Sequence, residues 1–301
     1  MIANPQRRGI KLTHNLYLGD CAQFLERDAD KEPPFDFTFL DPPFNQGKDY
    51  REHNDRLDNG EYWDWMREIC RMTLERSSDG AAMYFMQREK NTEFLLQVLR
   101  ESGWDFHNLI VWRKKTSAIP SQVRYGKAYQ VIAYATKGRS PRVFNRLRID
   151  PPLPSGYVPR ERGMFVTDVW DDIRELTSGY YASDEALRDI SGERVHKQQS
   201  PVALLLRMLL SSTNPGDCVF DPFSGTGTTL VVASQLARYG VGVEKDEVNF
   251  NCIQERLRHI RAADSTDRYR DEYAHTEALN QIWSTQNLVD EPVLMLLNGV
   301  S

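Results

Sequence analysis

The sequence has few cysteines, no long apolar run and no overall excess of positive charge. Its four cysteines are widely separated and form no CxxC pair, which argues against a zinc ribbon and a disulfide framework. No stretch approaches the roughly 18 apolar residues of a membrane helix, and the N-terminus lacks an apolar signal segment, so we expect a cytoplasmic protein with no membrane partner. A net charge of −5 excludes a protein that coats nucleic acid indiscriminately.

The composition is that of an ordinary globular protein. The chain has 301 residues, of which 40% are hydrophobic and 27% are charged. This length suits one large domain with an insertion, or two modest domains. The six histidines show no spacing of the HExxH kind, so the sequence predicts no metal site.

Positive charge is nevertheless concentrated in one part of the chain. Residues 106–149 contain ten Lys and Arg and no acidic residue, whereas the rest of the chain has 28 basic and 43 acidic residues. Trp112, Tyr125, Tyr129 and Tyr134 are interleaved with these charges, as in surfaces that bind nucleic acid. The alternative is a solvated surface balanced by acidic neighbours in space. The block favours a localised polyanion-binding face.

Strand and helix patterns alternate along most of the chain. A continuously apolar strand is predicted at 35–40, and the prolines that follow must end it. Ser200 is predicted to cap a helix that has Pro201 at its first position. The alternation predicts an α/β fold with a mostly parallel sheet covered by helices on both faces. The other predicted strands are 81–86, 108–112, 130–135, 218–220 and 240–244, and the predicted helices begin near 59 or span 91–101, 202–210, 229–238 and 247–261.

Two segments depart from this alternation. Residues 138–193 contain five prolines and only weak helical signals near 183–190, which predicts an irregular insertion. Beyond residue 262 the chain is polar and acidic until an apolar patch at 292–297. This patch could dock on the body of the protein or on a partner chain.

The sequence DPFSGTGTT at 221–229 lies where a predicted strand meets a predicted helix. Its two glycines let the backbone approach a ligand at the helix N-terminus, which suits an anionic or zwitterionic cofactor. No GK[ST] ends the turn, so it is not a Walker loop, and Leu230 occupies the third glycine position of the dinucleotide fingerprint. Glu244 ends the next strand, where a carboxylate can accept hydrogen bonds from ribose hydroxyls. Together they indicate a cofactor site rather than an ordinary turn.

A second motif, DPPF at 41–44, follows the buried strand at 35–40. Its carboxylate, rigid backbone and aromatic ring would project from the carboxyl end of the sheet, where ligands bind in open α/β folds. The DPPL at 150–153 repeats the first three residues without a preceding buried strand and without the aromatic residue. We interpret that second copy as a loop.

Together, DPPF and DPFSGTGTT resemble the beta group of DNA amino-methyltransferases, in which the catalytic motif precedes the cofactor motif. The resemblance extends over most of residues 15–257. NLYLGDC at 15–21 is similar to the family's strand that ends in an acid, and DVW at 168–170 to the segment before its cofactor-proximal helix. HKQQSP at 196–201 stands where the family commonly has HPTQKP, so Ser200 replaces a lysine.

The resemblance implies a Rossmann-like methyltransferase fold with circularly permuted motif order. It divides the chain into a catalytic half at 1–137, a target-recognition insertion at 138–193, a cofactor-binding half at 194–261 and a C-terminal extension at 262–301. It implies S-adenosylmethionine as the cofactor, with Glu244 on the ribose and Asp20 toward the adenine amine, and double-stranded DNA as the partner. The cofactor contacts expected from it are Asp20, Cys21, Ser200, Asp221, Phe223, Gly225, Thr226, Gly227, Thr228 and Glu244. The expected catalytic residues are Asp41, Pro42, Pro43 and Phe44, and the residues expected on DNA phosphates are Arg113, Lys114, Lys115, Arg124 and Lys127.

The DPPF motif suits methyl transfer to an exocyclic amine, whose lone pair is delocalised into the base. Asp41 and the Pro42 carbonyl can accept its two N–H bonds, which directs the lone pair toward the methyl group. Phe44 would stack on a base that has left the duplex. Attack at carbon 5 of cytosine would need a thiolate in this turn, and no cysteine follows a proline there.

Several alternatives stay open at this point. Adenine N6 is favoured over cytosine N4 because Asp heads the motif where cytosine N4 enzymes more often have Ser. Two other interpretations are an RNA substrate and a non-catalytic nucleic-acid-binding subunit of the same fold. A homodimer and an accompanying restriction endonuclease are partners that the sequence neither predicts nor excludes.

Overall fold

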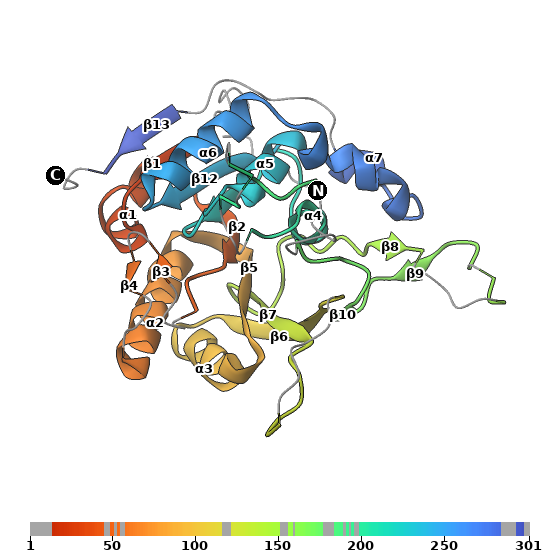
Figure 1. Ribbon diagram of the computed structural model, residues 1–301, viewed down its shortest axis with the longest axis horizontal. Coiled ribbons are helices and arrows are strands. Elements are labelled where there is room, and N and C mark those ends of the chain that lie inside the picture. The colour runs from red at the N-terminus through yellow and green to blue at the C-terminus, as the bar shows by residue number, and fades with distance from the viewer. Residues whose placement is uncertain are drawn as a thin grey trace.

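The computed structural model describes residues 14–44, 49–50, 53–54, 58–115, 122–150, 156–158, 160–176, 184–188, 191–192, 194–195, 199–283 and 293–297. Their main feature is a nine-stranded sheet in the order β10-β6-β7-β5-β2-β11-β12-β1-β13 (Figure 1). Its strands are β1 (Asn15–Leu18), β2 (Phe35–Leu40), β5 (Ser77–Arg88), β6 (Asp105–Arg113), β7 (Tyr129–Thr136), β10 (Val169–Trp170), β11 (Cys218–Asp221), β12 (Tyr239–Glu244) and β13 (Val293–Leu296). Two short pairs lie outside it: β3 (Asp49–Tyr50) with β4 (His53–Asn54), and β8 (Arg148–Ile149) with β9 (Met164–Phe165).

Strand β7 runs antiparallel to both of its neighbours, β5 and β6, and the other neighbouring pairs of the sheet are parallel. Helices cover both faces of the sheet, as predicted. Apolar side chains of α1 (Cys21–Arg27), α2 (Asn59–Arg76) and α3 (Thr92–Glu101) pack on one face. Those of α4 (Val202–Ser212), α5 (Thr228–Gln235) and α6 (Glu247–Arg258) pack on the other. The short helix α7 (Leu279–Ile282) lies in the C-terminal part.

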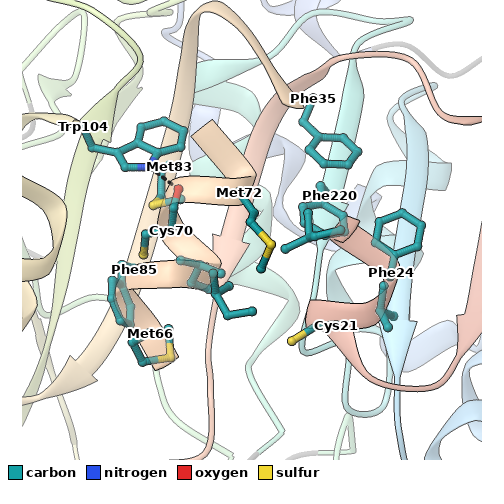
Figure 2. Close-up of a cluster of buried hydrophobic side chains, with 14 of the residues drawn as sticks. Cys21, Phe24, Phe35, Met66, Cys70, Met72, Met83, Phe85, Trp104 and Phe220 are labelled. Carbon is teal, nitrogen blue, oxygen red and sulfur yellow. Dashed lines mark hydrogen bonds between the residues drawn. The ribbon is translucent and has the colours of Figure 1, made fainter. Parts of the chain in front are cut away.

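The centre of the sheet is β2, whose six residues FDFTFL are all buried. Alternate side chains point to opposite faces, so Phe35 joins the cluster under α2 and Phe37 joins the cluster under α4. Figure 2 shows the first cluster, in which Phe35 stacks on Phe220 of the neighbouring β11 with ring centroids 4.1 Å apart. The buried Asp36 is satisfied because it accepts the backbone N–H of Cys218 at 2.9 Å.

The predicted strands and helices are confirmed, with shifted ends. Strand β5 is longer than predicted at both ends, because its residues beyond 81–86 pair with β2 and β7. Helix α5 ends before its predicted limit, and Ala237 follows it with φ +58°. None of the helices that the structure describes is long and apolar enough to cross a membrane.

The prediction that Ser200 caps α4 is wrong. The N-cap is Pro201, whose side chain makes no capping hydrogen bond. The N–H of Val202 is instead accepted by the carboxylate of Glu185 at 2.9 Å. Ser200 therefore lies outside the helix, and its hydroxyl is directed elsewhere.

The insertion is irregular, as predicted, and contributes β8, β9 and β10. No helix is present in its described residues 184–188, so the weak helical signal there was not realised. The apolar patch at 292–297 docks on the body, because its described part forms β13, which pairs in parallel with β1 at the edge of the sheet.

Candidate active site

The two motifs meet where the strand order reverses. From β2 the chain passes through α2 to β5 on one side, whereas from the adjacent β11 it passes through α5 to β12 on the other. Thr38 and Phe220 are register partners, so Asp41 and Phe223 each stand three residues further on. Neighbouring strands are about 4.8 Å apart, and ligands of open α/β sheets bind at such a switch point. The structure thus brings the DPPF turn beside the glycine-rich turn.

Four acidic residues follow four adjacent strands at this edge. Asp41 follows β2, Asp221 ends β11, Glu244 ends β12 and Asp20 lies two residues beyond β1. Because parallel strands place their carboxyl ends at the same edge, these acids form one row across the sheet. The row is therefore a site rather than four separate turns.

The glycine-rich turn is held by backbone hydrogen bonds, one to strand β12 and one within the turn. Ser224 donates its N–H to the Val243 carbonyl at 3.0 Å, and Gly227 donates its N–H to the Ser224 carbonyl at 2.7 Å. Gly225 and Gly227 have φ values of +52° and +79°, which favour glycine. A Cβ on Gly227 would also lie 2.7 Å from the side chain of Ile253. Both glycines are thus required by the backbone path that opens helix α5.

The carboxylate of Glu244 also holds this turn. It accepts the N–H of Gly225 at 2.7 Å and the N–H of Asp246 at 2.8 Å. Burial raises the pKa of Glu244 to about 7, against which these two backbone donors act. The fully buried Asp221 has a pKa raised to about 6 for the same reason, and it accepts the N–H of Phe223 at 3.1 Å.

Asp20 and Cys21 open helix α1 at the other end of the row. One oxygen of Asp20 accepts the N–H of Ala22 at 2.9 Å, so this acid is the N-cap of the helix. Cys21 is buried among apolar side chains, and burial raises the pKa of its thiol well above the ordinary value. Cys21 is therefore a packing residue whose thiol is not activated.

The DPPF turn lies against the start of α4. Ser200 donates its hydroxyl to the carboxylate of Asp41 at 3.3 Å. The hydroxyl is free to do so because Ser200 does not cap α4. Asp41 and Pro43 are partly exposed, whereas Pro42 and Phe44 are buried. On the cofactor side, Trp65 of α2 packs edge-on against Phe223, with ring centroids 5.6 Å apart.

A buried charge network that sequence reasoning missed supports the glycine-rich turn from behind. Arg256 of α6 donates to the Thr226 carbonyl at 2.6 Å and to the Thr228 hydroxyl at 3.3 Å. Its guanidinium pairs with the fully buried Asp264, which also pairs with Arg261. Burial raises the pKa of Asp264, but its bonds to Arg261 and Arg256 lower it by more, so this pKa lies below its ordinary value. No local motif marks these residues, since the contacts form only when α6 and the extension fold back.

Glu185 in the insertion supports the other side of the site. Its carboxylate accepts the Val202 N–H and, at 2.6 Å, the Tyr269 hydroxyl. Its carbonyl accepts the side-chain amide of Gln199 at 3.0 Å and the guanidinium of Arg261 at 2.8 Å. Glu185 therefore fixes the chain next to Ser200 and links it to the network under the glycine-rich turn.

The five predicted phosphate contacts gather at the connection between β6 and β7. Strand β6 is antiparallel to β7, which is antiparallel to β5, so β6 runs in the same direction as β2. Its carboxyl end therefore lies at the same edge of the sheet as Asp41, about 14 Å away across three strand spacings. The residues are Arg113, Lys114, Lys115, Arg124 and Lys127, of which Lys127 forms an ion pair with Glu89.

The basic block as a whole does not form one face, which corrects the sequence prediction. Strand β7 runs from the edge of the active site to the opposite edge of the sheet. Lys137 and Arg139 follow β7, so they lie at that opposite edge. Arg142 is neutralised there by ion pairs with Asp36 and Asp217. Only the first half of the block therefore lies beside the site.

The histidines do not form a metal site in the described part of the chain, where no group of three or more potential ligands is present. His14 lies in the core, accepts the N–H of Gly240 at 3.0 Å and has a pKa lowered to about 4 by burial. His196 lies outside the described residues. Trp63 and Met66 lie in the core, on α2.

Comparison with known proteins gives a consistent result. A protein-family model described as DNA methylase matches residues 35–255. The type II methyltransferase M.BamHI of Bacillus amyloliquefaciens is 30% identical over 81% of this chain, which spans 57% of that protein. The DNA adenine methyltransferase YhdJ of Escherichia coli K12 is 30% identical, with 76% of each chain covered.

Two solved structures show the same fold. M1.HpyAVI in complex with SAM is similar with a TM-score of 0.56 and 20% identity, covering 81% of this chain and 99% of that one. The PvuII DNA methyltransferase, described as cytosine-N4-specific, has a TM-score of 0.59 and 17% identity, covering 89% of this chain and 93% of that one. The predicted Rossmann-like fold is thereby confirmed.

Proposed function

The chain belongs to the DNA methylase family, and from this premise we propose that it is an S-adenosylmethionine-dependent DNA methyltransferase that acts on the N6 amine of adenine. The observation that carries the proposal is the convergence of Asp41 and the glycine-rich turn at the carboxyl ends of the adjacent strands β2 and β11. One turn can hold an acceptor amine and the other a methyl donor.

The residues at the switch point fit S-adenosylmethionine. Gly225 and Gly227 form the turn that opens α5, where the amino-acid part would lie, with Phe223 beside it. Glu244 would accept the ribose hydroxyls, because its carboxylate has about four acceptor positions, of which two are used by backbone N–H groups and a third, at 3.5 Å, by the side-chain amide of Asn249. When bound, this cofactor supplies a methyl group on a positively charged sulfur.

Asp41 and the Pro42 carbonyl would hold the acceptor amine. Each accepts one N–H, which localises the lone pair on nitrogen and stabilises the positive charge that develops there. Ser200 orients the Asp41 carboxylate through its hydrogen bond. Phe44 would stack on the extruded base after rotating out of its buried position. In this scheme residues 138–193 contribute target recognition.

The choice of adenine rests on Asp41 at the head of the motif and on the likeness to YhdJ, whose name specifies adenine. The test is incubation with plasmid DNA and isotopically labelled cofactor, followed by nucleoside mass spectrometry and methylation-sensitive sequencing. Label in N6-methyldeoxyadenosine supports the proposal. Label in N4-methyldeoxycytidine would overturn the adenine assignment, and label in 5-methyldeoxycytidine would overturn the mechanism.

Cofactor affinity is expected to rise with pH because of Glu244. Its pKa of about 7 means that the carboxylate is mostly protonated at pH 6.5 and mostly ionised at pH 8. The ionised form is the better acceptor for ribose hydroxyls, so cofactor affinity should increase about fourfold from pH 6.5 to pH 8. Asp221, whose pKa is about 6, is already mostly ionised over this interval. Equilibrium dialysis with labelled cofactor measures the effect. Glu244→Gln should bind more weakly and show no such slope; an unchanged slope in this variant would exclude Glu244 as its source.

A further inference from the structure

The described part of the connection between β6 and β7 contains an exposed stretch, residues 122–126, which we call the tip. Residues 122–126 are all exposed, and Tyr125 is 98% and Val123 92% accessible. Single exposed apolar side chains are common on protein surfaces. Here, however, two lie within three residues of each other with Arg124 between them.

The base of this connection is fixed, although its tip is exposed. Lys114 donates its N–H to the Ala128 carbonyl at 2.8 Å, which closes the base. On one side Lys127 pairs with Glu89 at 2.6 Å, just beyond β5. On the other, the N–H of Lys115 is accepted by Glu175 at 2.8 Å. The tip is thus carried on a support that is anchored to both flanks.

The tip projects from the edge that carries the active site. The described residues leading into β7 extend away from the sheet, below β6 and β7 in Figure 1. Arg124, next to Tyr125, and Arg113, at the end of β6, are both exposed, so cations suited to phosphates lie beside the ring in sequence and at the base of the connection. A duplex bound with its target base at Asp41 would have its stack within reach of this tip.

We propose that Tyr125 inserts into the DNA stack and fills the space left by the extruded target base. This proposal rests on the proposed function. A phenol ring has the size and the flat apolar faces to stack between base pairs, which offsets the cost of unstacking the target. Arg124 and Arg113 would hold the adjacent backbone while the ring is inserted. The role assigned to Tyr125 is that of a positioning residue, since it does not touch the reacting atoms.

A second exposed aromatic side chain provides a control. Phe106 is 46% accessible and lies near the start of β6. Because β6 ends at the edge of the active site, its start lies at the opposite edge of the sheet from Asp41. Phe106→Ala therefore tests whether the loss of any exposed aromatic ring has the same effect.

The experiment measures single-turnover methyl transfer to two oligonucleotide duplexes that contain the site identified by sequencing. One duplex is fully paired, and in the other the partner of the target base is abasic, so that extrusion costs less. Tyr125→Ala should slow transfer at least about tenfold on the paired duplex and less than about twofold on the abasic one. Tyr125→Phe and Phe106→Ala should stay within about twofold of wild type on both.

The outcomes separate the two proposals. Recovery of Tyr125→Ala on the abasic duplex supports insertion of the ring. Equal loss on both duplexes, or an equal loss in Phe106→Ala, would overturn the role of Tyr125 while leaving the methyltransferase assignment intact. A wild-type protein that transfers no methyl to DNA would overturn the proposed function and, with it, this inference.

Discussion

Asp41→Ala is expected to reduce the rate of methyl transfer by at least about 10²-fold while leaving cofactor binding near the wild-type level. Removing one preorganised group that stabilises developing charge typically costs about 3 to 4 kcal/mol in the transition state. The proposed cofactor contacts Phe223, Gly225 and Gly227 follow β11 and Glu244 ends β12, whereas Asp41 follows β2. Single-turnover rates on DNA and the dissociation constant of labelled cofactor measure the two effects separately.

The chain contains its own control for this substitution. Asp150 heads the second DPP tripeptide, is exposed and lies 3.0 Å from His275 instead of at the switch point. Asp150→Ala should therefore methylate DNA at the wild-type rate. Near-normal methylation by Asp41→Ala would refute the catalytic assignment.

Asp264→Ala is expected to destabilise the protein by about 3–5 kcal/mol, because it leaves Arg256 buried without its ionic partner. The side chains of Arg256 and Asp264 are 2% and 0% exposed, so water cannot replace the lost contact. Cofactor affinity should also fall, since Arg256 holds the Thr226 carbonyl. Urea unfolding followed by circular dichroism measures the free energy of unfolding.

An exposed ion pair on the same helix serves as the control for this prediction. Arg258 pairs with Glu255 at 3.1 Å, with 38% and 67% of the two side chains exposed. Such pairs contribute little to stability, so Arg258→Ala should leave the unfolding midpoint almost unchanged. If Asp264→Ala unfolded at the same midpoint as Arg258→Ala, the network would not support the glycine-rich turn in the way described.

The order of the elements and the meeting of the two motifs could be predicted from the sequence. Residues 35–40 are continuously apolar and DPPF follows them directly, while DPFSGTGTT follows a second short strand. In a parallel sheet the carboxyl ends of strands share an edge, so the position of both turns follows from local pattern alone.

The supporting residues could not be predicted in this way. Glu185, Arg256 and Asp264 are ordinary charged residues in the sequence, and their partners lie up to tens of residues away. Their role depends on burial, which depends in turn on how α4, α6 and the C-terminal extension pack. Ser200 was assigned to a helix cap because proline follows it, yet Glu185 satisfies the helix and Ser200 bonds to Asp41.

The basic block was predicted as one face because charge was counted along the chain. Strand β7 is eight residues long and crosses the sheet, so the charges before and after it lie at opposite edges. A count of charges along the sequence cannot reveal this separation, because it depends on the direction in which each strand runs. The charges that remain at the edge of the active site are those that flank Tyr125.

The most direct test of the proposed active site is a crystal structure of the protein with S-adenosylmethionine bound. We expect the amino-acid part of the cofactor to lie against the turn at 223–227, its ribose hydroxyls to bind Glu244, and its methyl group to face Asp41. A cofactor bound away from this row of acids, or one whose methyl group points away from Asp41, would contradict the proposed active site.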